Sequence, residues 1–334
     1  MENFKTIEFH EARDFSKKMN VTFDFIRQNF KGLGKSIIVI AGPSVLVASL
    51  LIGSFMGDLM NMTQAITLNP GNSEALQSYF LSVSVWVQAM LMFVFFLLST
   101  VMSLATINNY LILYGEKRSS EIEVHEVWER VRDTFWMYLG SVILFGVMGM
   151  VAYIVLLVPV ILLATAGTPW MLFFLIPLVL CALLYLFVGS MLTFFIRGYE
   201  RLGFFQAVGR SLKLVSGKWW STFGLFMVLY MIMYFTSAIF MTPYYALTVI
   251  STLHQVEPAS FGEVSSSMQL VTLICFTLYY MAQLLLSSLP NIGLAFQYFN
   301  LVELKESKGL MEQIETIGQP QPSPPSTTSE EEQY

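Results

Sequence analysis

The chain has 334 residues, of which 55% are hydrophobic and 12% are charged, and its formal net charge is −5. Because a soluble domain carries about 25% charged residues, this composition excludes an ordinary soluble fold. Residues 135–196 contain no Asp, Glu, Lys or Arg, which is typical of membrane-spanning helices. We therefore expect an all-α polytopic membrane bundle.

The first segment, residues 1–35, is polar and charged, and we expect it to lie in the cytosol. It lacks a short apolar core followed by a small-residue cleavage site, so no cleavable signal peptide is expected. Apolar side chains spaced by three or four residues predict an amphipathic helix over about residues 12–31: Phe15, Met19, Phe23, Ile26 and Phe30. Such a helix either senses the lipid surface or simply packs under the bundle.

Six apolar stretches follow, each long enough to cross a bilayer core of about 30 Å. Pro43 is expected to kink the first. The short turn ATAGT joins the third to the fourth, which predicts an antiparallel hairpin. The six predicted spans are residues 36–56, 79–105, 136–163, 170–196, 221–251 and 268–301.

Two more amphipathic helices are predicted, at residues 121–133 and 197–220. The second is the most basic connection between spans, and its apolar side chains recur every three or four residues. Those side chains are Leu202, Phe205, Val208, Leu212, Val215 and Trp219. Helices of this kind lie in the membrane interface, so we expect three interfacial amphipathic helices beside the six transmembrane helices.

The cations of residues 197–220 are candidate contacts for anionic lipid head-groups: Arg201, Arg210, Lys213 and Lys218. Each cation near such a surface contributes about 1 kcal/mol. The alternative is that they only set topology and contact lipid without selectivity.

All 18 lysines and arginines fall in four segments: seven in the N-terminal segment, four between the second and third spans, five between the fourth and fifth, and two after the sixth. The other three connections have none. Since cytoplasmic loops carry the Lys and Arg excess, both termini are expected in the cytosol.

Each odd-numbered span is entered through the same pattern, aromatic-x-x-apolar-Gly, at residues 30–34, 136–140 and 220–224. We therefore interpret residues 36–301 as one transmembrane domain of three helix-hairpin repeats. The alternative is that any helix entering a bilayer carries such residues, and repeats are also common in transporters.

The C-terminal part divides in two. Residues 302–317 predict a short cytosolic helix. Residues 318–334 are rich in Pro and Ser, acidic and poor in apolar side chains, which predicts a disordered tail.

Three short motifs carry a resemblance: Glu200–Ala207, Arg210–Leu214 and Gly217–Trp220. Together they resemble a broad bacterial family that includes the membrane domain attached to some glycerophosphodiester phosphodiesterases and stand-alone six-span proteins of unknown function. The segment Leu304–Glu315 is similar to the ends of stand-alone members from Bacteroidetes. The resemblance implies a bacterial inner-membrane location. It does not imply phosphodiesterase activity, because the catalytic part of those enzymes is a separate barrel.

The sequence shows no clustered carboxylates and histidines, no phosphate-binding Gly-rich loop and no nucleophile elbow. We expect a non-enzymatic protein without a metal, cofactor or nucleic-acid partner. Pro243 and Pro290 are candidate helix breaks, and Asn291 a candidate cavity residue, with a plain packing kink as the alternative.

Two functions stay open at this point. The first is lipid handling, envelope homeostasis or support of a membrane-protein partner, with membrane lipids, anionic ones included, as partners. The alternative is a transporter or exporter of an uncharged or amphipathic solute that uses the broken helices.

Overall fold

The computed structural model describes residues 7–68, 73–165, 169–246, 249, 266–307, 309, 311 and 314. Within these residues every regular element is helical and there is no strand. Six helical stretches are long and apolar enough to span a membrane: Gly42–Leu59, Val83–Lys117, Val124–Leu162, Phe173–Glu200, Trp219–Ala246 and Leu270–Glu306. The predicted all-α, multi-pass architecture is confirmed.

The N-terminal region forms two helices, α1 (Phe15–Ile40) and α2 (Gly42–Leu68). The Asp14 side chain begins α1 by accepting a hydrogen bond from the Lys17 backbone N–H at 2.8 Å. The helices join at Ala41 because Pro43 has no N–H and its ring clashes with the carbonyl four residues earlier. The candidate span begins at Gly42 and not at the predicted residue 36, since Ser36 to Ile40 belong to α1.

The next elements are α3 (Ser73–Leu81), α4 (Val83–Lys117) and α5 (Val124–Thr165). The amphipathic helix predicted at residues 121–133 is not separate, because α5 runs without a break into the third span. No proline or glycine occurs between residues 124 and 139 to end the helix.

The basic region forms two helices rather than the single predicted helix over residues 197–220. After α6 (Pro169–Ser190) come α7 (Thr193–Glu200) and α8 (Phe204–Val215). Arg201 ends α7 in the left-handed conformation, with φ 54°. The Gly203 N–H then donates to the Gln206 side chain at 3.2 Å, which begins a new helix. At the other end of α8, Gly217 has φ 80°, a conformation that glycine adopts without strain.

The remaining elements are α9 (Trp219–Ala238), η1 (Ile239–Met241), α11 (Ser266–Leu286) and α12 (Ser288–Glu306). The last two spans are interrupted close to the predicted prolines. Pro243 follows η1, and Pro290 lies in the first turn of α12, where a missing N–H needs no partner. The first residues of the predicted helix 302–317 continue α12, while the predicted tail 318–334 lies outside the described residues.

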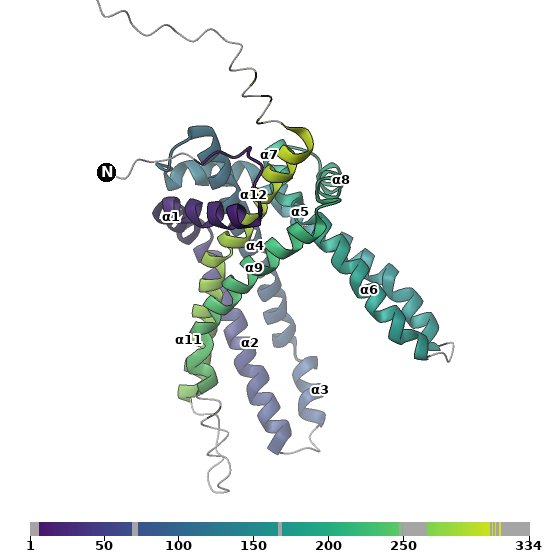
Figure 1. The fold of residues 1–334 in the computed structure, drawn as a ribbon. Helices are drawn as coiled ribbons and strands as arrows, with labels where there is room; N and C mark the ends of the chain where they lie inside the picture. The colour runs from purple at the N-terminus through teal and green to yellow at the C-terminus, as the bar shows by residue number, and fades with distance from the viewer. Residues whose placement is uncertain are drawn as a thin grey trace, which may run out of the picture.

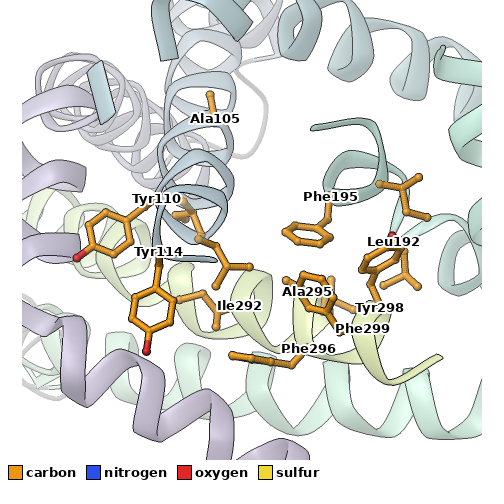
Figure 2. Close-up of a cluster of buried hydrophobic side chains, with 14 of the residues drawn as sticks. Ala105, Tyr110, Tyr114, Leu192, Phe195, Ile292, Ala295, Phe296, Tyr298 and Phe299 are labelled. Atoms are coloured by element: carbon orange, nitrogen blue, oxygen red, sulfur yellow. The ribbon is translucent and has the colours of Figure 1, made fainter. Parts of the chain in front are cut away.

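The core forms around α12, in which every residue from Ile292 to Val302 is buried. Figure 2 shows its aromatic side chains between Tyr114 of α4 and Phe195 of α7. The ring centres of Phe195 and Phe299 lie 5.4 Å apart. We call this region the head: α1, residues 101–117 of α4, residues 124–142 of α5, and α7, α8 and α12.

The apolar helices extend away from the head at one end (Figure 1). Consecutive spans contact each other along the whole chain, α2 with α4, α4 with α5, α5 with α6, α6 with α9 and α9 with α11, and α2 also packs along α11. The α5–α6 pair diverges from α2, α4 and α11 (Figure 1).

Candidate functional site

Arg210, which was predicted to contact lipid, forms ion pairs with two carboxylates of the protein itself. Its Nε lies 3.1 Å from both Glu200 oxygens, and its terminal nitrogens form a second ion pair with Glu306. Hydrogen bonds to Glu306 and Glu200 raise the pKa of the Arg210 guanidinium. The Tyr298 hydroxyl donates to Glu200 at 2.5 Å. Arg210 therefore joins α8 to α7 and α12 inside the head.

The other three predicted cations, Arg201, Lys213 and Lys218, are exposed. Arg201 ends α7, Lys213 lies on α8 and Lys218 precedes α9. The structure does not bring them together at one site, and they remain candidate head-group contacts.

The buried face of α8 is displaced from the predicted apolar stripe. Phe205 belongs to that stripe but is 72% exposed. The residues that face the head are Phe204, Ala207, Val208, Ser211, Leu214 and Val215. Ser211 donates to the Gly189 carbonyl at 2.6 Å, which fixes α8 against the end of α6.

A cavity of about 580 Å³, which we call the hairpin cavity, is lined by residues of α2, α4, α5, α6, α7, α11 and α12. Five of the six candidate spans line it. Its apolar wall includes Val45, Ile52, Phe96, Val142, Phe145, Phe194 and Leu284. Its polar wall includes Ser49, Ser99, Ser103, Gln283, Ser287 and Asn291.

Most of these polar side chains are bonded within their own helix. Ser99 and Ser103 donate to carbonyls four residues earlier at 2.6 Å. Gln283 donates to the Tyr279 hydroxyl at 2.7 Å, and Asn291 to the Ser287 carbonyl at 2.8 Å. Because these polar side chains already donate hydrogen bonds within the protein, the lining of the cavity suits a mainly apolar ligand.

The predicted helix-break residues lie differently around this cavity. Asn291 lines it, one turn beyond the end of α11. Pro290 is buried beside Asn291, and Pro243 is exposed on the fifth span. The α11–α12 break therefore opens on the hairpin cavity.

A second cavity, of about 930 Å³, lies in the head, and we call it the head cavity. Its charged lining residues are Glu8, Glu116, Arg118, Arg130, Asp133 and Arg201. Arg130 and Glu116 form a two-pronged ion pair. The two charge signs are balanced, so this cavity is not an anion site by charge alone.

The two cavities follow each other along α4, α5 and α7. On α5, Val142 lines the hairpin cavity and Met137 the head cavity; on α7 the corresponding residues are Phe194 and Gly198. With a rise of 1.5 Å per residue, about 6–8 Å of helix separates them. We call the residues in this interval the polar layer: Asn108, Tyr138, Ser141 and Arg197.

Arg197 is the cation of the polar layer. Its Nη1 donates to Ser141 at 2.5 Å and its guanidinium lies 5.8 Å from the centre of the Phe204 ring. Among the described residues, no carboxylate forms an ion pair with it. Arg197 Nε is buried and has no hydrogen-bond partner in the described part of the chain, whereas the buried Tyr138 hydroxyl faces the Asn108 side chain.

Sequence reasoning counted Arg197 only as a topology-determining cation. The signal that singles it out is its position directly after the charge-free residues 135–196. The Arg197 side chain points toward Ser141 because a turn at residues 191–192 separates α7 from α6. That turn was not predicted from the sequence.

Within the residues that the structure describes, no three His, Cys, Asp or Glu side chains gather as metal ligands would. No family model, curated protein or solved structure matches the chain.

Proposed function

We propose that this chain is a non-enzymatic integral membrane protein that handles lipid, holding a lipid or similar amphipath in the hairpin cavity. The observation that supports this function is the cavity itself. It lies among the apolar spans, its volume falls within the range of about 300–1,000 Å³ usual for ligand sites, and its polar donors are mostly satisfied within the protein.

The location that we propose is a bacterial inner membrane, with both termini in the cytosol. The Lys and Arg distribution supports this orientation, and the resemblance in residues 200–220 supports the membrane. Lipid handling there would serve envelope homeostasis or a membrane-protein partner.

The test is native mass spectrometry of the protein extracted with its own lipids. A Cβ added at Gly146 meets no atom within 4 Å, and Gly146 lines the cavity, so Gly146→Phe places a ring in the ligand space. Gly149→Phe is the matched control, because Gly149 has the same free space on the same helix but does not line the cavity. We expect a stoichiometric lipid that survives detergent exchange in wild type and Gly149→Phe and is lost in Gly146→Phe.

Equal lipid retention in both variants, or no retained lipid in wild type, would contradict the proposal. A second polypeptide at fixed ratio would identify the chain as a subunit, and its partner would then define the function.

The second candidate function is export of an amphipathic solute. The observation that favours it is the alignment of the two cavities, which only the polar layer separates. Proteoliposomes test it: an exporter moves a fluorescent amphipath across the vesicle membrane faster than protein-free vesicles do, and Gly146→Phe abolishes the difference.

A further inference from the structure

The hairpin cavity alone gives little selectivity. Lipid chains are as apolar as leucine side chains, so transfer from bilayer to an apolar cavity lacks the hydrophobic driving force available in water. A lipid that occupies this cavity in preference to bulk lipid therefore gains its binding energy from close packing and from polar contacts, and the polar contacts select its head-group.

The polar layer offers that contact at the head end of the cavity. Phe145 and Phe194 line the cavity, and their ring centres lie 5.1 Å apart. Ser141 and Arg197 lie one turn farther along the same two helices and are hydrogen-bonded to each other. Arg197 and Ser141 do not themselves line the cavity, so the end group of a ligand whose chain fills it would meet Arg197 about one helical turn beyond the head end of the cavity.

The hydrogen bonding of the polar layer is incomplete among the described residues. Arg197 has five N–H donors, of which one donates to Ser141, and its buried Nε has no acceptor among the described residues. Tyr138 is 0% exposed, and its hydroxyl faces Asn108 beside the Arg197 guanidinium. A buried polar atom without a partner is a usual mark of a missing water, ion or ligand.

An uncompensated arginine within a membrane domain selects oxyanions. Its planar donors match a carboxylate or phosphate, and an ionisable group near spanning helices marks a functional site by default. Glu200 and Glu306 form ion pairs with Arg210 and Glu116 with Arg130, and no ion pair among the described residues includes Arg197.

We propose that the hairpin cavity binds an amphipath with an anionic head-group, and that Arg197 in the polar layer binds the oxyanion while Ser141 holds the guanidinium in place. This inference rests on the proposed lipid-handling function and names its ligand class. A fatty acid and an anionic phospholipid share the required chemistry, an oxyanion at the end of an apolar chain.

The test compares two probes of equal chain length, a long-chain fatty acid and the corresponding fatty alcohol, at a pH where the acid is ionised. A charge-assisted hydrogen bond contributes about 1.5–3 kcal/mol, so wild type should bind the acid about tenfold or more tightly than the alcohol. In Arg197→Gln the acid should lose this preference while alcohol binding stays unchanged. Arg197→Lys, which keeps the charge, should retain part of the preference.

The variants separate the two proposals. Gly146→Phe should weaken both probes, and if neither probe binds wild type, the lipid-handling function itself is wrong. If both bind but Arg197→Gln leaves the acid-to-alcohol ratio unchanged, only the anionic ligand class is wrong. Inorganic phosphate that binds wild type as tightly as the fatty acid would define a soluble-anion site and overturn the proposal. An anionic phospholipid that displaces the fatty acid identifies the membrane as the ligand's source.

Discussion

At the scale of single residues, a cation that was predicted to face the membrane surface can instead be paired inside the head. Arg210 illustrates this, since its 26% exposed side chain bridges Glu200 and Glu306 instead of facing lipid. A helical wheel places Arg210 and Lys213 on similar surfaces, but it contains no information on α12, which supplies one of the carboxylates. Which cation is structural therefore depends on contacts between residues 96 positions apart.

We predict that Arg210→Met destabilises the protein by about 1.5–3 kcal/mol, because it leaves two carboxylates without their hydrogen-bonded cation. Thermal unfolding in detergent measures the effect as a lowered midpoint. Lys213→Met is the control, since Lys213 is exposed on the same helix and should stay near wild type. Equal midpoints for the two variants would show that the Arg210 bridge contributes nothing.

A second prediction concerns the buried amine of Lys18. It is 2% exposed and donates to Ser221 and Gln297, both at 2.8 Å. Burial lowers its pKa, and so does the charge of Lys218, while Asp14 acts in the opposite direction. Between the lowered folded-state pKa and the unfolded value of about 10.4, the unfolded chain binds more protons, so stability rises with pH.

The measurement is the unfolding midpoint of wild type relative to Lys18→Met from pH 7 to 10. We expect the difference to shift in favour of wild type as the pH rises, because the variant lacks the titrating amine. Parallel curves would show that Lys18 is not held in a desolvated site.

At the scale of elements, hydropathy and charge predicted the six spans, and prolines predicted the breaks near residues 43, 243 and 290. The division of the amphipathic segments was not predictable in the same way. The helical periodicity of residues 121–133 is the same whether that helix stands alone or continues as α5. The helix α7 ends because Arg201 adopts the left-handed backbone conformation, and the periodicity of apolar residues does not reveal that change.

The close approach of α7 to α5 gives a prediction at this scale. A Cβ added at Gly198 would lie 2.2 Å from the Tyr138 hydroxyl oxygen, on a ring that is 0% exposed. Gly198→Ala should therefore cost about 1–3 kcal/mol. Gly209→Ala, in the open interior of α8, should instead stabilise by about 0.5–1 kcal/mol.

A double-mutant cycle checks the cause of the Gly198 effect. Tyr138→Phe removes the oxygen that the new methyl group would meet, so it should recover part of the stability lost in Gly198→Ala. Strict additivity of the two changes would mean that the strain lies elsewhere.

For the whole molecule, the organising feature is a head from which the apolar hairpins diverge (Figure 1). Sequence patterns predicted the hairpins but not the head, because α12 mixes Gln297 and Asn300 with aromatic residues and yet is buried along most of its length. The cavities were unpredictable for the same reason, since each arises where helices distant in sequence diverge. Asn291 could be named beforehand because it follows a proline; Arg197 could not, because its direction depends on the turn before α7.

The proposed orientation gives a whole-molecule prediction. Cys181 and Cys275 are first replaced by Ser, and a single cysteine is placed at Ser119, beside Arg118, or at Asn69, in a connection without Lys or Arg. In cells with a permeable outer membrane, an impermeant maleimide should label Asn69→Cys and leave Ser119→Cys unlabelled until the inner membrane is opened. The reverse pattern would contradict the orientation.

The central claim is that an anionic amphipath lies in the hairpin cavity with its head-group at Arg197. Photo-crosslinking with a fatty acid that carries a diazirine in its chain, followed by peptide mapping, tests it most directly. We predict adducts within residues 96–104 and 142–146 that disappear in Gly146→Phe and persist in Gly149→Phe. Adducts spread over the exposed face of α6, around Phe173 and Phe174, and unchanged in Gly146→Phe would contradict the account.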